Sequence, residues 1–222
     1  MAERPPVKLG VLISGSGTNL QAIIDAVERG GLRADLRVVI SNRPSAPGLE
    51  RARKHGIPAL VIEHRRYATR EAFDAELVKA LTERDVELVA CAGFMRLFSS
   101  VMLDAFPARI LNTHNALLPS FAGIHGPRDA LEYGVKIAGC TVFFVTAGVD
   151  AGPVIIQAAV PVLPDDDEQR LADRIKGAEH RVYPYAIRLY QEGRLSIQGR
   201  TVRIAGGSAD DAALPLINPR TD

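Results

Sequence analysis

The sequence predicts one α/β domain with a mostly parallel, doubly wound sheet, followed by a long C-terminal helix and a small hairpin. Short apolar runs alternate with segments of helical periodicity through the first half, an order that builds parallel sheets by right-handed crossovers. The 222 residues, 47% hydrophobic and 24% charged, suit one globular domain, with no internal repeat or dividing linker. We expect a single domain over 1–222, with its core at about 7–205 and a flexible tail at 206–222.

The chain begins with a strand, a glycine-rich turn and a helix. An apolar run at 7–14 leads into G-S-G-T-N at 15–19, and helical apolar spacing follows. Such a turn presents backbone N–H groups and a helix N-terminus to an anion. Leu20 replaces the third glycine of a dinucleotide fingerprint, and no Walker A motif is present. We expect a single phosphate here, and weigh equally a tight turn whose helix cap is Thr18 or Asn19.

Further elements alternate along the first half. We expect strands at 35–41, 59–63 and 88–91, with helices at 48–55 and 69–84. Thr69 is the predicted capping residue, with Glu71 and Asp74 in the first turns. The segment 92–98 then leads into a helix that ends by Phe106, because Pro107 follows.

The second half contains the remaining strands and the longest helix. We expect a strand that begins near Arg109, a short helix at 128–133, strands at 136–145 and 154–162, a helix at about 168–192, and a hairpin of 195–197 and 202–204. The acidic run 165–168 has the composition of a cation site. A helix cap explains it better, because acidic side chains stabilise helix N-termini.

Two polar residues follow the apolar run that begins near Arg109. Asn112 and His114 lie two apart, so on a strand their side chains point the same way. An amide donates to a developing negative oxygen, and an imidazole carries a proton near neutral pH. The alternative is that both residues only satisfy backbone groups in a loop. Ligands of parallel sheets bind at the strands' carboxyl ends, where the 15–19 turn, Met95 and Asp150 are also expected.

Composition excludes several classes of function. The formal net charge is +1, with no long basic run, which argues against nucleic-acid and membrane partners. Cys91 and Cys140 lie in apolar segments, typical of reduced, buried thiols. No apolar run reaches transmembrane length, and the N-terminus lacks the apolar core of a signal peptide. We therefore expect a cytoplasmic protein.

Four motifs in order resemble the folate-dependent phosphoribosylglycinamide formyltransferases. They are G-S-G-T-N at 15–19, A-G-F-M-R-L at 92–97, N-T-H-x-x-L-L-P at 112–119 and V-D-A-G-P-V-I at 149–155. The resemblance runs from about Lys8 to Leu195 and implies the Rossmann-like formyltransferase fold. L-L-P and D-x-G also occur in methionyl-tRNA formyltransferase and formyltetrahydrofolate hydrolase. The phosphate loop and the lack of a second domain favour the glycinamide ribonucleotide family over these two.

The resemblance implies roles for individual residues. Asn112, His114 and Asp150 match the family's catalytic residues. The implied ribonucleotide contacts are Gly17, Thr18, Asn19 and Glu179, and the implied folate contacts are Arg70, Met95, Arg96, Leu97, Phe98 and Asn112. The implied partners are glycinamide ribonucleotide and 10-formyltetrahydrofolate as co-substrate, with no metal, in a monomer or homodimer.

The implied reaction suits these side chains. The glycinamide amine attacks the formyl carbon, and donors placed for the resulting oxyanion contribute about 3 kcal/mol each. Asn112 is the expected donor, a cationic His114 a second, and Asp150 the group that orients His114 and assists proton transfer. Hydrolysis of the formyl-folate and ribonucleotide binding without turnover remain alternatives.

The chain departs from the family's usual residues near the implied folate and formyl positions. The departures are Asn115, Ala116, Ala122, Phe143, Ala147 and Gly148. Loss of proline after His114 frees the loop, Phe143 replaces a titratable group with apolar bulk, and Ala147 and Gly148 remove charge. Two hypotheses follow: a transformylase with an altered folate pocket, or a variant that handles another acyl donor or acceptor.

Overall fold

The computed structural model describes residues 4–206, which form a nine-stranded sheet in the order β3-β2-β1-β4-β5-β6-β7-β9-β8. The predicted tail, from 207 onward, lies outside the described residues. The strands are β1 (Val7–Ile13), β2 (Ala34–Ser41), β3 (Ala59–Val61), β4 (Leu88–Cys91), β5 (Ile110–His114), β6 (Ile137–Phe144), β7 (Val154–Pro161), β8 (Leu195–Gln198) and β9 (Thr201–Ile204). The predicted class, a mostly parallel α/β sheet with a long C-terminal helix and a hairpin, is confirmed.

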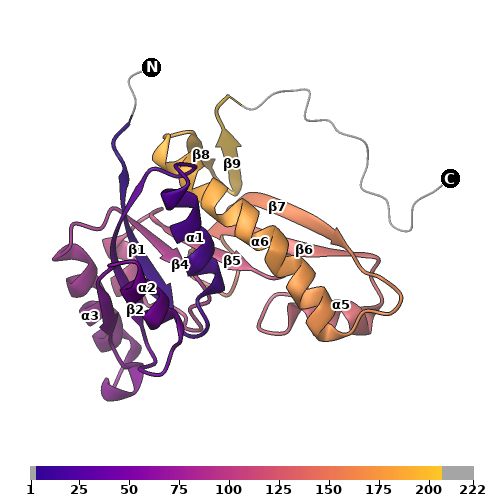
Figure 1. The fold of residues 1–222 in the computed structure, drawn as a ribbon, viewed down its shortest axis with the longest axis horizontal. Helices are drawn as coiled ribbons and strands as arrows, with labels where there is room; N and C mark the ends of the chain where they lie inside the picture. The colour runs from indigo at the N-terminus through magenta and orange to yellow at the C-terminus, as the bar shows by residue number, and fades with distance from the viewer. Residues whose placement is uncertain (1–3, 207–222) are drawn as a thin grey trace.

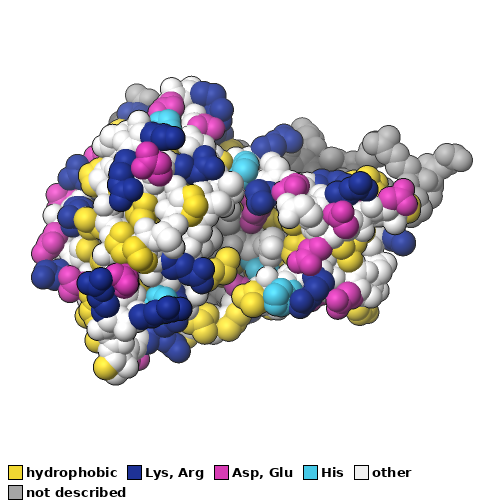
Figure 2. All heavy atoms as spheres, turned by 60° about the horizontal axis from the view of Figure 1, so that its bottom comes forward, with side chains coloured by type: hydrophobic (Ala, Val, Ile, Leu, Met, Phe, Trp, Pro, Cys, Tyr) yellow, Lys and Arg dark blue, Asp and Glu magenta, His cyan; other side chains and the backbone are white. Residues whose placement is uncertain are grey.

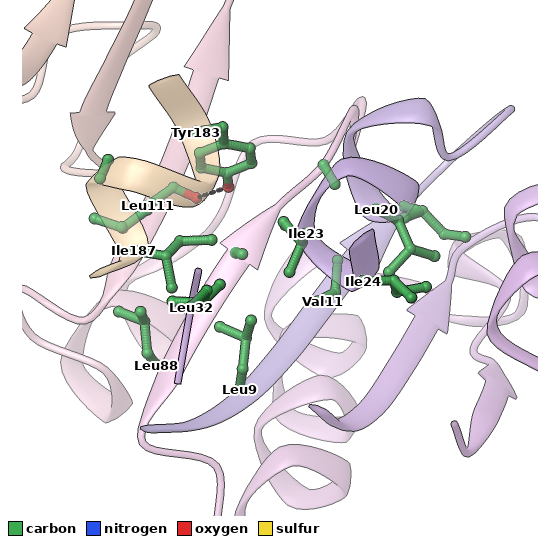
Figure 3. Packing of buried hydrophobic residues seen from close by; sticks show 14 of the residues in the cluster. Leu9, Val11, Leu20, Ile23, Ile24, Leu32, Leu88, Leu111, Tyr183 and Ile187 are labelled. Carbon is green, nitrogen blue, oxygen red and sulfur yellow. Dashed lines mark hydrogen bonds between the residues drawn. The ribbon is translucent and has the colours of Figure 1, made fainter. Parts of the chain in front are cut away.

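The helices pack on both faces of this sheet (Figure 1). They are α1 (Thr18–Glu28), α2 (Gly48–Lys54), α3 (Arg70–Thr82), α4 (Ser100–Ala105), α5 (Gly126–Tyr133) and α6 (Glu168–Gln191), with a 3-10 turn η1 (His64–Arg66). On one face, Leu9 and Val11 of β1 pack with Ile23 of α1 and Ile187 of α6 (Figure 3). On the other face, Leu12 packs with residues of α3 and α4. The alternation along β1 therefore divides the core into two layers.

The sheet changes direction after β5. Strands β3, β2, β1, β4 and β5 run parallel to one another. Strand β6 runs antiparallel to β5 and to β7, and the β8–β9 hairpin joins β7 through the parallel pair Val154 and Thr201. A third cluster of buried residues lies beneath this half, between β6, β7, α5 and α6. The carboxyl ends of β4 and β5 therefore lie where the parallel half meets the antiparallel half.

Tyr183 of α6 ties β4 to β5 near this boundary. Its buried hydroxyl lies 3.0 Å from the carbonyl oxygens of both Cys91 and Leu111. The bond to Leu111 is visible in Figure 3. A single hydroxyl proton is shared between two acceptors here, so Tyr183 fixes how far β4 and β5 separate at their ends.

Two of the predicted helix caps are present. The Thr69 hydroxyl accepts a hydrogen bond from Ala72 N at the start of α3, and Asp167 accepts one from Arg170 N at the start of α6. Asp166 pairs with Arg174 through two contacts of 2.6 and 2.8 Å, and these hold the pKa of Asp166 at about 2. The acidic run thus acts as a cap, as predicted.

The predicted cap of α1 is wrong. Its N-cap is Gly17, in the left-handed conformation at φ 69°, and no side chain caps the helix. Thr18 and Asn19 are instead the first two residues of the helix. The first N–H groups of α1 are left without a capping oxygen, which matters for the site.

No helix within 4–206 is long and apolar enough to cross a membrane. Over the same residues, no group of three or more histidine, cysteine or acidic side chains is placed to hold a metal ion.

Candidate active site

A cavity of about 530 Å³ opens at the carboxyl ends of β1, β4 and β5. Its lining comprises residues 15–19, 92–97 and 112–115, together with Gly123, Ile124, Val149, Asp150, Lys176 and Glu179. Figure 2 shows this face as a hollow between two lobes of the molecule. Met95, Leu97, Ile124 and Val149 are exposed at its rim, between 50% and 75% of their surfaces. The rim therefore offers apolar contact area to a ligand, while the interior is polar.

The glycine-rich turn forms one end of this cavity and is held against α2. Gly15 accepts a hydrogen bond from Gly48 N at 3.1 Å, and Arg51 Nε donates to the Ser16 carbonyl at 2.8 Å. A Cβ on Gly17 would lie 2.7 Å from Gly48 Cα, so only glycine fits. The turn thus directs the uncapped start of α1 into the cavity, near Lys176, an arrangement suited to an anion.

Glu179 lines the same cavity as this turn and is 7% exposed. Its Oε1 accepts from the Thr113 hydroxyl at 2.9 Å, and Asn19 is a second hydrogen-bond partner. Burial raises the pKa of Glu179 above its ordinary value, and these two hydrogen bonds and the charge of His114 oppose the rise. Asn19 Oδ1 is buried without a partner among the described residues. Helix α6, helix α1 and strand β5 therefore meet through three polar side chains at the cavity wall.

His114 ends β5 and is 7% exposed. Its Nε2 lies 2.9 Å from the Phe121 carbonyl, which can only accept, so Nε2 carries a proton. Its Nδ1 lies 3.6 Å from Asp150 Oδ2. Because Nε2 is committed to the backbone, Nδ1 is the ring atom left to face Asp150 and a ligand.

Asp150 is held in place by the loop after β5. Its Oδ2 accepts a hydrogen bond from Gly123 N at 3.1 Å, and its backbone is left-handed at φ 48°. Phe121, which provides the carbonyl for His114, also has a positive φ of 53°. Two non-glycine residues in an unfavourable conformation therefore fix both polar partners of the site, a placement typical of functional loops.

Asn112 and His114 line the same cavity, as the two-residue spacing predicts. Thr113 between them is turned toward Glu179. The Asn112 carboxamide makes no side-chain hydrogen bond to any described residue. The alternative was that Asn112 and His114 only form hydrogen bonds with backbone groups of the loop. Of their side-chain atoms, only His114 Nε2 forms such a bond within the described part of the chain, to the Phe121 carbonyl. The carboxamide donors of Asn112 remain available to a ligand.

A smaller cavity of about 100 Å³ adjoins the first and shares Asn112 and Asp150 with it. Arg70, Arg96, Leu97 and Phe98 line it together with Phe94, Phe143 and Gly148. The rings of Phe94 and Phe98 stack at 5.6 Å. This side therefore combines aromatic walls with two guanidinium groups.

The two cavities bring together all the predicted site residues. Gly17, Thr18, Asn19, Glu179, Met95, Arg96, Leu97, Asn112, His114 and Asp150 line the larger one, while Arg70 and Phe98 line only the smaller. Sequence reasoning missed Lys176 and Thr113. Lys176 lies three residues before Glu179 on one helix, so helical spacing alone places it on the same face.

The departures from the family's usual residues divide between the two cavities and their surroundings. Asn115 lines the larger cavity, and Phe143 and Gly148 line the smaller. Phe143 is 2% exposed and pairs in register with Asn112. Ala116 is buried and accepts from the Thr141 hydroxyl, and neither Ala122 nor Ala147 lines either cavity. Only Asn115, Phe143 and Gly148 are therefore placed to change what binds.

Comparison with known proteins gives a family match along most of the chain. Residues 7–187 match the formyl transferase family. The chain is 41% identical over 196 residues to phosphoribosylglycinamide formyltransferase of Escherichia coli, covering 88% of this chain and 92% of that one. It is 49% identical over 188 residues to the trifunctional purine biosynthetic protein adenosine-3 of Drosophila melanogaster, covering 84% of this chain. It spans only 14% of that trifunctional protein's length.

Solved structures of formyltransferases are also similar to this chain. Glycinamide ribonucleotide transformylase 1 of Symbiobacterium toebii superposes with a TM-score of 0.89 at 57% identity, covering 90% of this chain and 94% of that one. Phosphoribosylglycinamide formyltransferase of Coxiella burnetii superposes with a TM-score of 0.86 at 38% identity, with the same coverage.

Proposed function

This chain belongs to the formyl transferase family, and on that premise we propose that it transfers a formyl group from 10-formyltetrahydrofolate to the amino group of glycinamide ribonucleotide. One observation supports the proposal above the others. The pair of His114 and Asp150, the free carboxamide of Asn112 and the anion-binding turn at 15–19 all face one cavity. A phosphorylated acceptor and an acyl-transfer centre thus fit side by side.

The acceptor is proposed to lie along the α1 and α6 side. Its phosphate contacts the N–H groups at the start of α1, around Gly17, Thr18 and Asn19, with Lys176 supplying charge. Glu179 accepts from a ribose hydroxyl or the glycinamide group. Both partners of Glu179 are already placed, so the carboxylate is oriented before the ligand arrives.

The donor is proposed to occupy the side formed by Arg70 and residues 95–98. Its rings contact the apolar rim, and its acidic end meets Arg70 or Arg96. The residues fit such a molecule, since the stacked Phe94 and Phe98 offer flat apolar surface beside two cations. Phe143 makes the wall beside Asn112 apolar and without a titratable group.

In the proposed reaction, the glycinamide nitrogen forms a bond to the formyl carbon, and the bond from that carbon to the folate N10 breaks. Asn112 donates to the oxyanion that forms between the two events, a contribution of about 3 kcal/mol. The Nδ1–H of a cationic His114 is the second donor, and Asp150 stabilises that cation. The proton lost by the amine reaches N10 through Asp150 and a water molecule.

A coupled assay tests the proposal. Purified protein is mixed with 10-formyltetrahydrofolate, with and without glycinamide ribonucleotide, and formyl loss and formate are both followed. We expect formyl loss only when both substrates are present, without formate release. Formate release in the absence of the ribonucleotide would instead show a hydrolase. If the protein binds the ribonucleotide but shows no turnover in either arm, it is a binding protein and the proposed reaction is wrong.

A further inference from the structure

The segment 92–98, between β4 and α4, contributes to the walls of both cavities, and its residues Phe94, Arg96 and Leu97 line both of them. Within the described part of the chain, residues 94–98 make no backbone-to-backbone hydrogen bond. The sheet therefore does not fix them, although Arg96 and Leu97 line both cavities and Phe98 lines one. Something else must hold this wall, because an unbonded backbone of this length samples many conformations.

Side chains hold the segment near each end. At the front, the buried Ser14 hydroxyl accepts from Met95 N at 2.9 Å and donates to Asn42 Oδ1 at 2.7 Å. At the rear, Asp74 Oδ2 accepts from Ser99 N at 2.6 Å and from the Ser99 hydroxyl at 2.7 Å. The backbone from Met95 to Ser99 is therefore held at both ends by hydrogen bonds to buried side chains, those of Ser14 and Asp74.

The rear anchor is an unusual group to bury. Asp74 is 0% exposed, and its second oxygen, Oδ1, has no hydrogen-bond partner among the described residues. Burial raises the pKa of Asp74, with the Ser99 bonds opposing the rise. A half-satisfied buried carboxyl is a poor source of folding stability, since apolar residues fill such sites at lower cost. Its presence calls for another explanation.

That explanation lies in what Asp74 connects. On α3, Arg70 lies four residues earlier, on the same side of the helix, and lines the smaller cavity. Through Ser99, Asp74 also fixes the residue that follows Phe98. The neighbouring Phe73 ring stacks on Phe94 at 6.4 Å, within the same wall. One short stretch of α3 therefore sets the separation of Arg70 from the 96–98 wall.

We propose that Asp74 is a positioning residue for the donor side of the site: it sets the spacing between Arg70 and the 96–98 wall, and so the affinity for the formyl-folate. The inference rests on the proposed function, because it assigns the donor to this side. Asp74 is buried and lines neither cavity. It acts through Ser99, so its removal changes donor binding and leaves the acceptor end at 15–19 intact.

The experiment compares Asp74→Ala and Asp74→Asn with the wild type. Asp74→Ala removes both acceptor bonds, and we expect KM for 10-formyltetrahydrofolate to rise about tenfold while KM for the ribonucleotide stays within about twofold. Asp74→Asn keeps an oxygen acceptor of the same shape, so we expect KM for the donor to return to within about threefold of wild type. Equilibrium dialysis with tetrahydrofolate measures donor-side affinity without turnover.

Asp167→Ala is the matched control, because that carboxylate also accepts from a backbone N–H at a helix start, 2.7 Å away, and lines neither cavity. We expect it to lower Tm and to leave both KM values unchanged. If Asp74→Ala raises both KM values equally, or neither, the positioning role is overturned. A wild-type protein that neither turns over nor binds tetrahydrofolate would overturn the proposed function itself, and the inference with it.

Discussion

The two sides of the larger cavity are built in different ways. The helix side, formed by the turn 15–19, α1 and α6, is fixed by a glycine turn packed on α2 and by a 24-residue helix. The loop side, formed by residues 92–97, Asn115, Gly123, Ile124, Val149 and Asp150, is fixed by single bonds such as His114 to the Phe121 carbonyl and Asp150 to Gly123 N. A substitution can therefore reshape the loop side locally, whereas the helix side changes only with the fold.

The departures from the family's usual residues follow this difference. Asn115, Phe143 and Gly148 all lie on or against the loop side, and the anion-binding turn keeps its motif. With the proposed placement of the two substrates, acceptor binding depends on the fold itself, while donor binding and chemistry depend on individual contacts.

The largest effect is expected when His114 is removed, and this variant tests whether the rate can be lowered without changing ribonucleotide affinity. His114→Ala deletes Nδ1, the proposed second oxyanion donor beside Asp150, and we expect kcat to fall about 10³-fold. Ribonucleotide affinity, measured by calorimetry, should stay within about twofold, because the helix side is untouched. His55→Ala, a histidine paired with Glu28 outside the cavity, is the control. Equal losses of rate and ribonucleotide affinity would contradict the division.

The helix side is tested by Gly17→Ala. Gly17 and Gly30 share a left-handed backbone, at φ 69° and 73°, so alanine strains both by about 1 kcal/mol. Only at Gly17 does the new Cβ meet an atom, Gly48 Cα at 2.7 Å; at Gly30 nothing lies within 4 Å. We expect Gly17→Ala to weaken ribonucleotide binding at least about tenfold and Gly30→Ala to leave it unchanged, measured as Kd. A similar loss in both variants would show that backbone strain alone matters.

A smaller effect is expected from pH. Burial raises the pKa of Glu179 above its ordinary value, so Glu179 takes up a proton at a higher pH than an exposed glutamate does. Protonation removes an acceptor from the proposed ribonucleotide contact, so we expect Kd for the ribonucleotide, measured by calorimetry, to rise as the pH is lowered. We expect Glu179→Gln to bind the ribonucleotide less tightly than the wild type and to lose the part of the pH dependence of Kd that comes from Glu179. For stability the sign is opposite: the raised pKa favours the folded state at low pH, an advantage lost as pH rises.

The smallest effect on activity is expected at Tyr183, which bridges β4 and β5. Tyr183→Phe removes the hydroxyl that bridges the Cys91 and Leu111 carbonyls, and we expect the free energy of unfolding to fall by about 1 kcal/mol in urea. Because neighbouring ladder bonds still hold β4 to β5, kcat should change by less than about twofold. A large loss of kcat would show that Asn112, next to Leu111, depends on this hydroxyl for its position.

The elements themselves were readable from apolar periodicity. The strand Leu88–Cys91 has the expected bounds. Helix α4 ends just before Pro107, and helix α6 begins after the acidic turn, both as expected. The antiparallel direction of β6 was not predictable, because an apolar run such as 137–144 suits either direction once both faces are covered. The cap of α1 was misassigned because Gly17 adopts the boundary conformation itself.

The site was predictable only in part. Spacing alone placed Asn112 and His114 on one side of a strand, but the meeting of His114 with Asp150 depends on a contact over 36 positions, which only the family resemblance supplied. Asp74 looked like an ordinary first-turn acid, because periodicity does not show that Ser99 lies opposite it. Contacts made by loops, such as the Phe121 carbonyl, leave no periodic signal at all.

The left-handed backbone at Asp150 has a consequence for how such a chain evolves. At φ 48° asparagine, aspartate and glycine are the tolerated residues. Asparagine and glycine are each one nucleotide change from an aspartate codon, and both abolish the carboxylate; asparagine also keeps an oxygen that can accept from Gly123 N. A lineage released from selection for activity could therefore lose the carboxylate proposed to carry the proton while keeping its architecture. Inactive descendants of this fold would superpose on active ones, and only the identity of this position would separate them.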